Sequence, residues 1–203
     1  MTRMNVGQVL NHRELVTIYG DPVQIPEPQR VMHLQFRRYA SCPVCNLHIR
    51  SFARRHEEIL AAGIREVVVF HSSTDTMRGF QGGLPFAAIA DPEKKLYSEF
   101  GVEKMSPRVA LIAALNPRSW LAAGRALRRA PSLHGAAGKG EEHLGLPADF
   151  LIGPGGRVLA AKYGKYVDDH WSVDELLGLA KNARDVAGTS QAPTGATTAL
   201  IRF

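Results

Sequence analysis

The segment Ser41–His48, with the sequence SCPVCNLH, contains both cysteines of a chain of 203 residues. Cys42 and Cys45 are separated by two residues, a spacing that brings two sulfurs close enough for a disulfide. The segment Val31–Arg37 before them is typical of a strand, and the residues after them have the periodicity of a helix. The sequence therefore predicts that the two cysteines open a helix directly after a strand.

A helix N-terminus is a favourable place for a thiolate. Its unpaired N–H groups and the helix dipole stabilise negative charge, which lowers the pKa of a thiol. Pro43 lacks an N–H group and fits an early position of the helix without cost. The pair could then cycle between a dithiol and a disulfide with little movement of the backbone.

Two other interpretations of the pair stay open. Free cysteines can be ordinary small buried side chains. They can also be half of a zinc site, but zinc requires four ligands and the chain has no further cysteine. His48 and the distant His71 or His143 would have to complete such a site. Redox chemistry is the favoured interpretation, with no metal and no bound cofactor expected.

The rest of the chain alternates between strand and helix patterns. Strands are predicted at Leu15–Tyr19, Val31–Arg37, Arg65–Ser72 and Leu84–Pro92, with a β-hairpin within Ala148–Gly164. Helices are predicted over Asn46–Gly63, Thr74–Phe80, Glu93–Gly101 and Ser172–Arg184. A Pro-rich turn, Gly20–Gln29, is expected between the first two strands. This order predicts an α/β fold with a mixed central sheet and helices on both faces.

Capping residues and two irregular regions refine this prediction. Thr74 or Asp75 is expected to cap its helix, and Ser172 with Glu175 forms a capping-box pattern. Residues 105–145 are too long for a connection and predict a helical insertion. Residues 187–203 are rich in Ala, Thr and Gly and predict a mobile tail. One domain is therefore expected over residues 1–186.

Three features together resemble the thioredoxin fold: a CxxC that opens a helix, a proline before a hairpin (GLPADFLIGPGGRV), and a C-terminal helix. The block Phe70–Val102, FHSSTDTMRGFQGGLPFAAIADPEKKLYSEFGV, also resembles the middle of peroxiredoxins. The chain is most similar to the peroxiredoxin-like branch of the alkyl hydroperoxide reductase/thiol-specific antioxidant superfamily. This resemblance implies a thioredoxin-like fold and an antioxidant oxidoreductase that uses a redox-active disulfide.

The two related templates disagree about the attacking thiol. Peroxiredoxins carry Thr-x-x-Cys with the attacking cysteine last, which corresponds to Cys45, whereas thioredoxins attack with the first cysteine, Cys42. Pro147 matches the thioredoxin proline that is cis and faces the pair, so the resemblance implies that Pro147, with Pro43, positions a substrate. No arginine precedes the hairpin as in peroxiredoxins, although Arg108 could replace it if the insertion folds over the site. This pattern favours exchange through Cys42, with Cys45 as the attacking thiol if the substrate is peroxide.

Basic side chains near the pair are candidates for stabilising a thiolate. His48 lies three residues after Cys45 on the same helix face, although a solvated or packing histidine is the alternative. Arg37 and Arg38 end the strand before the cysteines, where they could add positive potential or simply solvate the strand end. The arginines of the insertion are expected to form a solvated face.

Composition limits the classes of partner. The chain carries 25 Lys and Arg against 19 Asp and Glu, a formal charge of +6 that is scattered along the sequence, and no nucleic-acid partner is expected. No segment has the length and apolarity of a membrane span or a secretory signal, so a cytoplasmic location is expected.

The function expected is thiol–disulfide exchange or peroxide reduction through the CxxC pair. The substrate would be a small peroxide or a protein disulfide, and the reductant a thioredoxin-type protein or a low-molecular-weight thiol; a homodimer is compatible with the sequence. The alternative is a non-enzymatic redox sensor or interaction module on a thioredoxin-like scaffold.

Overall fold

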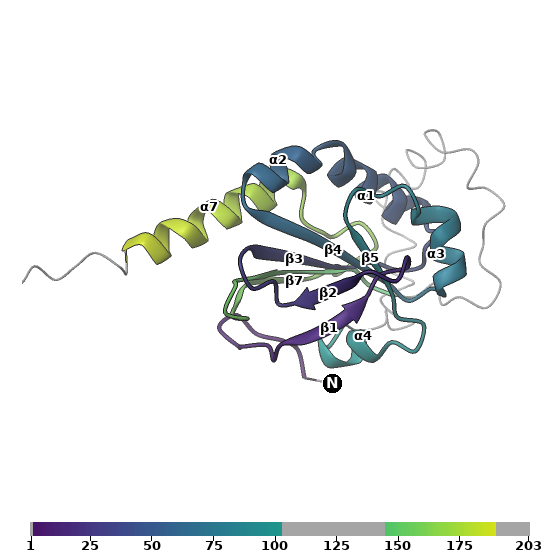
Figure 1. Ribbon diagram of the computed structural model, residues 1–203, viewed down its shortest axis with the longest axis horizontal. Helices are drawn as coiled ribbons and strands as arrows, with labels where there is room; N and C mark the ends of the chain where they lie inside the picture. Colours follow the sequence, from purple (N-terminus) through teal and green to yellow (C-terminus); the bar gives the residue numbers. More distant parts are fainter. Residues whose placement is uncertain (1, 103–144, 190–203) are drawn as a thin grey trace, which may run out of the picture.

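A computed structural model describes residues 2–102 and 145–189, and its centre is a mixed sheet of five strands (Figure 1). The strands lie in the order β5 (Ala87–Ala90), β4 (Ile64–Phe70), β3 (Val31–Phe36), β6 (Ala148–Ile152) and β7 (Val158–Tyr163). The pairs β3–β4 and β4–β5 are parallel, whereas β3–β6 and β6–β7 are antiparallel. The prediction of a mixed α/β sheet, with a hairpin at one edge, is confirmed.

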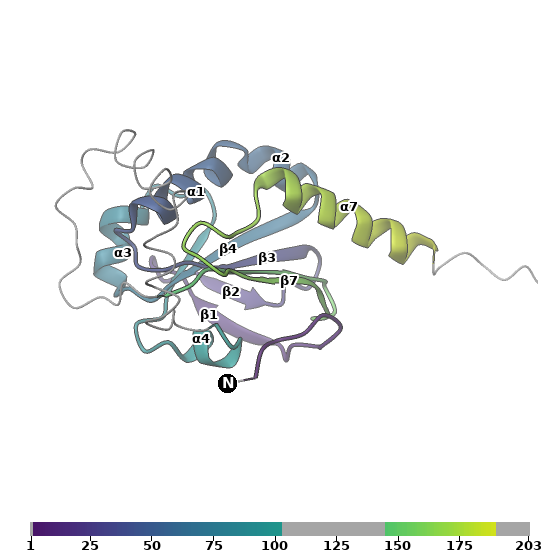
Figure 2. The same ribbon diagram turned by 180° about the vertical axis from the view of Figure 1, so that it is seen from behind.

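Helices and a small second sheet cover the two faces of this sheet (Figures 1 and 2). The helices are α1 (Pro43–Arg54), α2 (His56–Ala61), α3 (Thr74–Gln81), α4 (Lys95–Glu99) and α7 (Val173–Thr189). The helices α1, α2 and α7 lie on one face. The other face carries α4 and the antiparallel pair of β1 (Arg13–Val16) and β2 (Pro22–Ile25).

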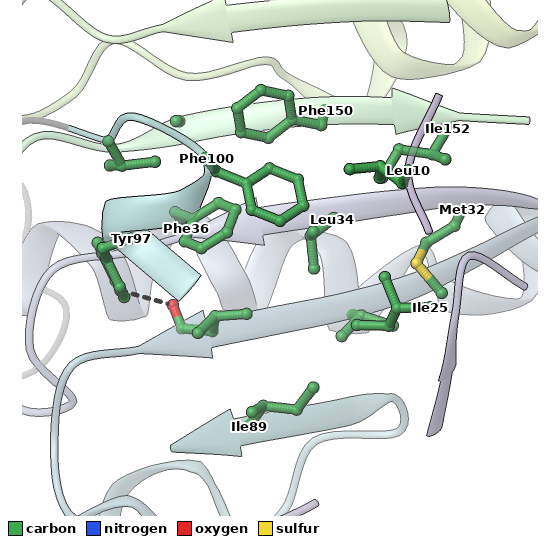
Figure 3. Close-up of a cluster of buried hydrophobic side chains, with 14 of the residues drawn as sticks. Leu10, Ile25, Met32, Leu34, Phe36, Ile89, Tyr97, Phe100, Phe150 and Ile152 are labelled. Atoms are coloured by element: carbon green, nitrogen blue, oxygen red, sulfur yellow. Dashed lines mark hydrogen bonds between the residues drawn. The ribbon is translucent and has the colours of Figure 1, made fainter. Parts of the chain in front are cut away.

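The side chains of the central strand β3 are buried on both faces of the sheet, with apolar residues on one face and mainly polar residues on the other. Met32, Leu34 and Phe36 alternate along it and point into the apolar core beneath β2 and α4, where Phe100 and Phe150 join them (Figure 3). Each of these three β3 residues is followed by a polar one that is fully buried: His33, Gln35 and Arg37. The face beneath α1 therefore contains ionisable groups instead of a purely apolar core.

The Pro-rich segment Gly20–Gln29 contains a strand, so the expectation of a simple turn is wrong. Val23 and Ile25 of β2 are buried and alternate with exposed residues, and Pro22 opens the strand at an edge, where its missing N–H group is tolerated. The strand expected at Leu15–Tyr19 overlaps β1 but begins earlier, at Arg13.

Two helix boundaries also differ from the expectations. The helix expected over Asn46–Gly63 is divided into α1 and α2 at Arg55, whose backbone leaves the helical range. The cap of α3 is Ser73, whose hydroxyl accepts a hydrogen bond from the N–H group of Thr76, rather than Thr74 or Asp75. The predicted capping box of α7 is confirmed, because Ser172 and Glu175 exchange hydrogen bonds.

Two predictions fall largely on residues 103–144 and 190–203, which lie outside the described part of the chain: the insertion over 105–145, and the tail over 187–203. The helix α7 extends to Thr189, beyond the expected start of the tail. The limits of the domain at 1–186 stay a prediction. In residues 2–102 and 145–189, no helix has both the length and the apolar character of a bilayer span.

Candidate active site

The two cysteines lie at the start of α1, as the sequence predicts. Cys42 is the N-cap residue, with an extended backbone, and Pro43 is the first residue of the helix. The backbone N–H groups of Cys45 and Val44 help to lower the pKa of the Cys42 thiol, although its side chain makes no capping hydrogen bond. Both thiols are free and are only 1% exposed.

The environment makes the two thiols unequal. A hydrogen bond from the Cys45 thiol, the positive charge of Arg38 and the helix N–H groups lower the pKa of Cys42 to about 6, against the opposing effect of burial. Burial, together with the neighbouring Cys42, raises the pKa of Cys45 well above its ordinary value. Cys42 is therefore the thiolate at neutral pH, and Cys45 is its protonated partner.

Arg38 supplies the cation of the site. Its Nη1 atom lies 3.6 Å from the sulfur of Cys42, and its guanidinium lies over the ring of Tyr39 at 5.3 Å. Burial and the nearby Cys42 raise the pKa of Tyr39 to about 12, so the phenol stays protonated beside the thiolate. Arg38 therefore lies where the sequence suggested a thiolate-stabilising charge, whereas Tyr39 was not identified from the sequence.

The loop that carries Cys42 is held by three polar side chains. The N–H group of Ala40 donates to the hydroxyl of Ser72 at 2.8 Å. The amide of Asn46 donates to the carbonyl oxygens of Ala40 at 2.7 Å and of Cys42 at 2.9 Å. The amide of Gln81 donates to the same Ala40 oxygen and to Asn46, both at 2.9 Å. We call the side chains of Asn46 and Gln81 the loop clamp.

The loop clamp was not found from the sequence. Asn46 and Gln81 are 35 residues apart and belong to different helices. Nothing in the local pattern shows that their amides meet at Ala40. Polar residues within amphipathic helical segments were the only signal, and such residues are usually solvated.

His48 and Arg37 belong to a second group of residues, beneath α1. The Nη2 atom of Arg37 lies 2.9 Å from Nε2 of His48, and the rings of His48 and His170 are stacked at 3.5 Å. Burial and the nearby His170 and Arg37 lower the pKa of His48 well below its ordinary value. His48 is thus a neutral ring that faces Arg37, so in this arrangement it adds no positive charge beside the thiolate.

The group beneath α1 continues as a chain of buried ion pairs. Arg37 donates to Asp149 at 2.5 Å. The two ring nitrogens of His33 lie 2.9 Å from Glu66 and 3.1 Å from Asp149. All four side chains are fully buried. Because both nitrogens of His33 face carboxylates, the geometry requires the doubly protonated ring, which brings two cations and two anions together.

Pro147 lies at the same end of the sheet as the cysteine loop, since its neighbour Ala148 pairs with Phe36, the last residue of β3. Its peptide bond with Leu146 is trans, because the cis bond found in the described residues is Ile25–Pro26. The expectation that Pro147 is cis is therefore wrong, and Pro147 gives no support for exchange over peroxide reduction. A role for Pro147 or Pro43 in positioning substrate stays a hypothesis.

Two further expectations concern ligands. Arg108 falls outside the described residues, so its suggested part in the site stays a prediction. Across the ranges that the structure describes, no cluster of three or more Cys, His, Asp or Glu side chains is arranged to hold a metal ion.

Solved structures with low sequence identity share this fold. Peroxidoxin BcpB from Mycobacterium tuberculosis is 15% identical, with a TM-score of 0.63 over 89% of this chain and 98% of that one. AhpC from Enterococcus faecalis is 13% identical, with a TM-score of 0.63 over 95% and 100%. A Chlorobium tepidum protein described as a thiol:disulfide interchange protein, DsbE, is 18% identical, with a TM-score of 0.56 over 89% and 98%. These similarities confirm the thioredoxin-like fold.

The sequence itself identifies the family. Residues 51–183, well over half of the chain, match the model of the family described as AhpC/TSA antioxidant enzyme. The matched residues begin after Cys45, so the assignment is independent of the cysteine pair. A search of curated proteins gave no match. The chain belongs to the AhpC/TSA antioxidant enzymes, a family of thiol-dependent redox proteins, as the resemblance in its sequence implied.

Proposed function

We propose that this chain is a peroxidase in which Cys42 attacks the peroxide and Cys45 then forms a disulfide with it. The observation that carries this proposal is the unequal ionisation of the two thiols. The pKa of Cys42 is lowered to about 6, whereas that of Cys45 is raised well above its usual value. The thiolate is the nucleophile, so the attacking sulfur is Cys42.

This assignment differs from the one that the peroxiredoxin template implied for peroxide, which placed the first attack at Cys45. The template follows the position of a cysteine in the motif. The proposal follows the charge, which depends first on the hydrogen bond from the Cys45 thiol, then on Arg38 and on the N–H groups of the helix.

The reaction proceeds in two steps. The Cys42 thiolate attacks one oxygen of ROOH, the O–O bond breaks, and the departing oxygen takes up a proton to leave as ROH; Cys42 becomes a sulfenic acid. The Cys45 thiol then attacks the sulfur of Cys42, which forms the disulfide and releases water. A dithiol or two monothiols from the cell reduce this disulfide and restore both thiols.

Arg38 would assist the first step. Its guanidinium, at 3.6 Å from the Cys42 sulfur, is positioned to donate hydrogen bonds to a peroxide oxygen at the moment negative charge develops there. The protonated phenol of Tyr39 offers a second donor nearby. The site thus contains a guanidinium and a hydroxyl, two hydrogen-bond donors that would stabilise the charge developing on a peroxide oxygen.

Thiol–disulfide exchange is the second candidate, because the same thiolate could attack a disulfide sulfur and Cys45 could resolve the mixed disulfide. A redox sensor without turnover is the third. The reductant, an association into dimers and a cytoplasmic location are part of this proposal as expectations from the sequence.

The test uses Cys42→Ser and Cys45→Ser variants. Each variant and the unaltered chain are treated with hydrogen peroxide or with a peptide that contains a disulfide. The modified sulfur is then identified by mass spectrometry. We expect sulfenic acid at Cys42 in the Cys45→Ser variant. In the Cys42→Ser variant we expect no rapid oxidation of Cys45. Rapid oxidation of Cys45 by peroxide would contradict the assignment.

Turnover separates the candidates. The expected result is dithiothreitol-driven consumption of peroxide by the unaltered chain. This turnover is lost in Cys42→Ser and altered in Cys45→Ser, where dithiothreitol must reduce the Cys42 sulfenic acid directly. Mixed-disulfide formation at Cys42 without peroxide turnover would replace the proposal with exchange. A disulfide that forms without catalytic turnover of either substrate would favour the sensor.

A further inference from the structure

A cavity of about 430 Å³ lies at the sheet edge formed by β5. Its walls come from α2, the end of α3, the start of β5 and residues 17–23. A cavity of this volume is in the range of small-molecule sites. Among the described residues that line it, neither cysteine is included, so it is distinct from the thiol site.

The lining presents polar and apolar surface in similar amounts. The largest apolar side chains come from α2 and from the segment before β5, and they are Leu60, Leu84 and Phe86. These residues are partly buried rather than closed into the core. A ligand of this cavity would therefore place an apolar body against them.

Some charged side chains that line the cavity are already paired with other side chains of the protein. The buried carboxylate of Glu66 accepts hydrogen bonds from both His33 and Gln35. Arg65 is paired with Glu27 at 2.6 Å. These groups have little capacity left for a ligand.

Arg30 is different. It lines the cavity and is exposed, and within the described residues it makes no hydrogen bond or ion pair. The acidic Asp21 also lines the cavity, but its carboxylate belongs to a tight turn with Thr17, whose hydroxyl lies 3.4 Å from Oδ2. Arg30 is therefore the charged side chain of the lining that has no partner within the described residues.

His56 provides a second polar contact. Its Nδ1 atom is buried and has no hydrogen-bond partner among the described residues, and its ring lies 5.7 Å from that of Phe86. A buried polar atom without a partner is uncommon in folded proteins. A ligand with an acceptor or donor at this point would satisfy it.

The cavity also reaches the thiol site through one side chain. Gln81 lines the cavity, and its amide is part of the loop clamp, where it donates to Ala40 and Asn46. Cys42 is almost completely buried, so we expect a reagent to reach its sulfur only after the loop moves. A molecule packed against Gln81 would hold the loop clamp in place.

We propose that this cavity binds a small organic anion with an apolar body, whose anionic group contacts Arg30. The ligand also contacts His56 and Gln81. Its binding favours the closed cysteine loop, so the ligand slows reactions of Cys42. The cavity is a regulatory site on the fold, separate from the sulfur chemistry.

Binding is tested by calorimetry with decanoate as the probe, and with decylamine as a probe of opposite charge. Decanoate is expected to bind saturably at one site, and decylamine to bind at least tenfold more weakly. Arg30→Ala should weaken decanoate binding about tenfold, the loss of one hydrogen bond to a charged group. His56→Phe should weaken it as well, whereas Arg50→Ala, an exposed arginine of α1 outside the cavity, should leave it unchanged.

The absence of saturable binding would overturn the proposal, as would equal binding of both probes or equal binding by the Arg30→Ala variant. The same titration on the Cys42→Ser/Cys45→Ser double variant gives a result that does not depend on thiol chemistry. A chain without peroxidase activity could therefore still bind decanoate, and an active peroxidase could fail to do so.

Coupling is measured as the rate at which iodoacetamide alkylates Cys42. If the open loop does not bind the ligand, decanoate at ten times its dissociation constant should slow alkylation about tenfold. In Gln81→Met, which keeps the side-chain length but removes the amide, alkylation should be faster and insensitive to decanoate. Alkylation unaffected by saturating decanoate in the unaltered chain would refute the coupling.

Discussion

The charged state of His33 should make the stability of the protein depend on alkaline pH. Burial by itself lowers the pKa of this ring, but the carboxylates of Glu66 and Asp149 outweigh it and raise the pKa to about 9. In the unfolded chain the ordinary value is 6.5. The folded state therefore binds the proton more tightly than the unfolded state does.

The difference between the folded and unfolded pKa values of His33 sets the sign and size of its effect on the free energy of unfolding. A raised pKa contributes stability that is fully present below the unfolded value and is lost as the pH rises through the folded value. Each pKa unit corresponds to about 1.4 kcal/mol, so the contribution of His33 is about 3 kcal/mol. Stability should fall by about this amount between pH 6 and pH 10.

The thiols titrate in the same range and must be removed from the measurement. The lowered pKa of Cys42 contributes stability that is lost as the pH falls through about 6, and Cys45 acts in the opposite direction. Urea unfolding of the Cys42→Ser/Cys45→Ser variant, from pH 6 to pH 10, removes the effect of the thiols. The same series with His33→Gln added is the control.

We expect a decline of about 3 kcal/mol in the thiol-free chain and a much flatter curve when His33 is replaced. A flat curve in the thiol-free chain would show that His33 is not a buried cation. An equal decline in both chains would assign the effect to another group. Either result would refute the reasoning from the two carboxylates.

Three further predictions concern single side chains. Asp149→Asn should lower the free energy of unfolding, measured in urea, by about 3–5 kcal/mol, because Arg37 would be left buried without its carboxylate. The exposed Asp174→Asn should have little effect, and equal effects of the two substitutions would contradict this prediction. Arg38→Met should raise the pKa of Cys42 by about one unit, seen as a shift in the pH profile of alkylation, and an unshifted profile would exclude Arg38 as the stabilising cation. Ser172→Ala should lower stability by about 1 kcal/mol in thermal unfolding, and no loss would show that its capping box contributes little.

Features carried by neighbouring residues could be predicted from the sequence. The hairpin of β6 and β7 follows from two apolar runs around Pro154-Gly155-Gly156, and the start of α7 follows from Ser172 and Glu175. In each case the residues that decide the structure lie within a few positions of one another, so local rules are sufficient.

The strand β2 shows where local rules fail. Its prolines indicated a turn, yet Val23 and Ile25 are buried against the main core. What stabilises this strand is its pairing with β1 and its burial on the sheet, neither of which is visible in ten residues rich in proline. The buried ion pairs could not be predicted for the same reason. Glu66 lies 33 residues and Asp149 lies 116 residues from His33 in the sequence.

The unequal pair of thiols depends on a boundary that the sequence leaves uncertain by one or two residues. With α1 beginning at Pro43, Cys42 is at the N-cap, where helix N–H groups face its sulfur, and Cys45 is one turn further, against the core. A helix that began three residues later would place Cys45 at the N-cap and give it the low pKa. The spacing of the motif is the same in both cases. The choice of the nucleophile therefore follows from the hydrogen bond that the Cys45 thiol gives to Cys42, from Arg38 and from where the helix begins. The two templates disagree because the CxxC pattern does not specify which thiol receives these effects.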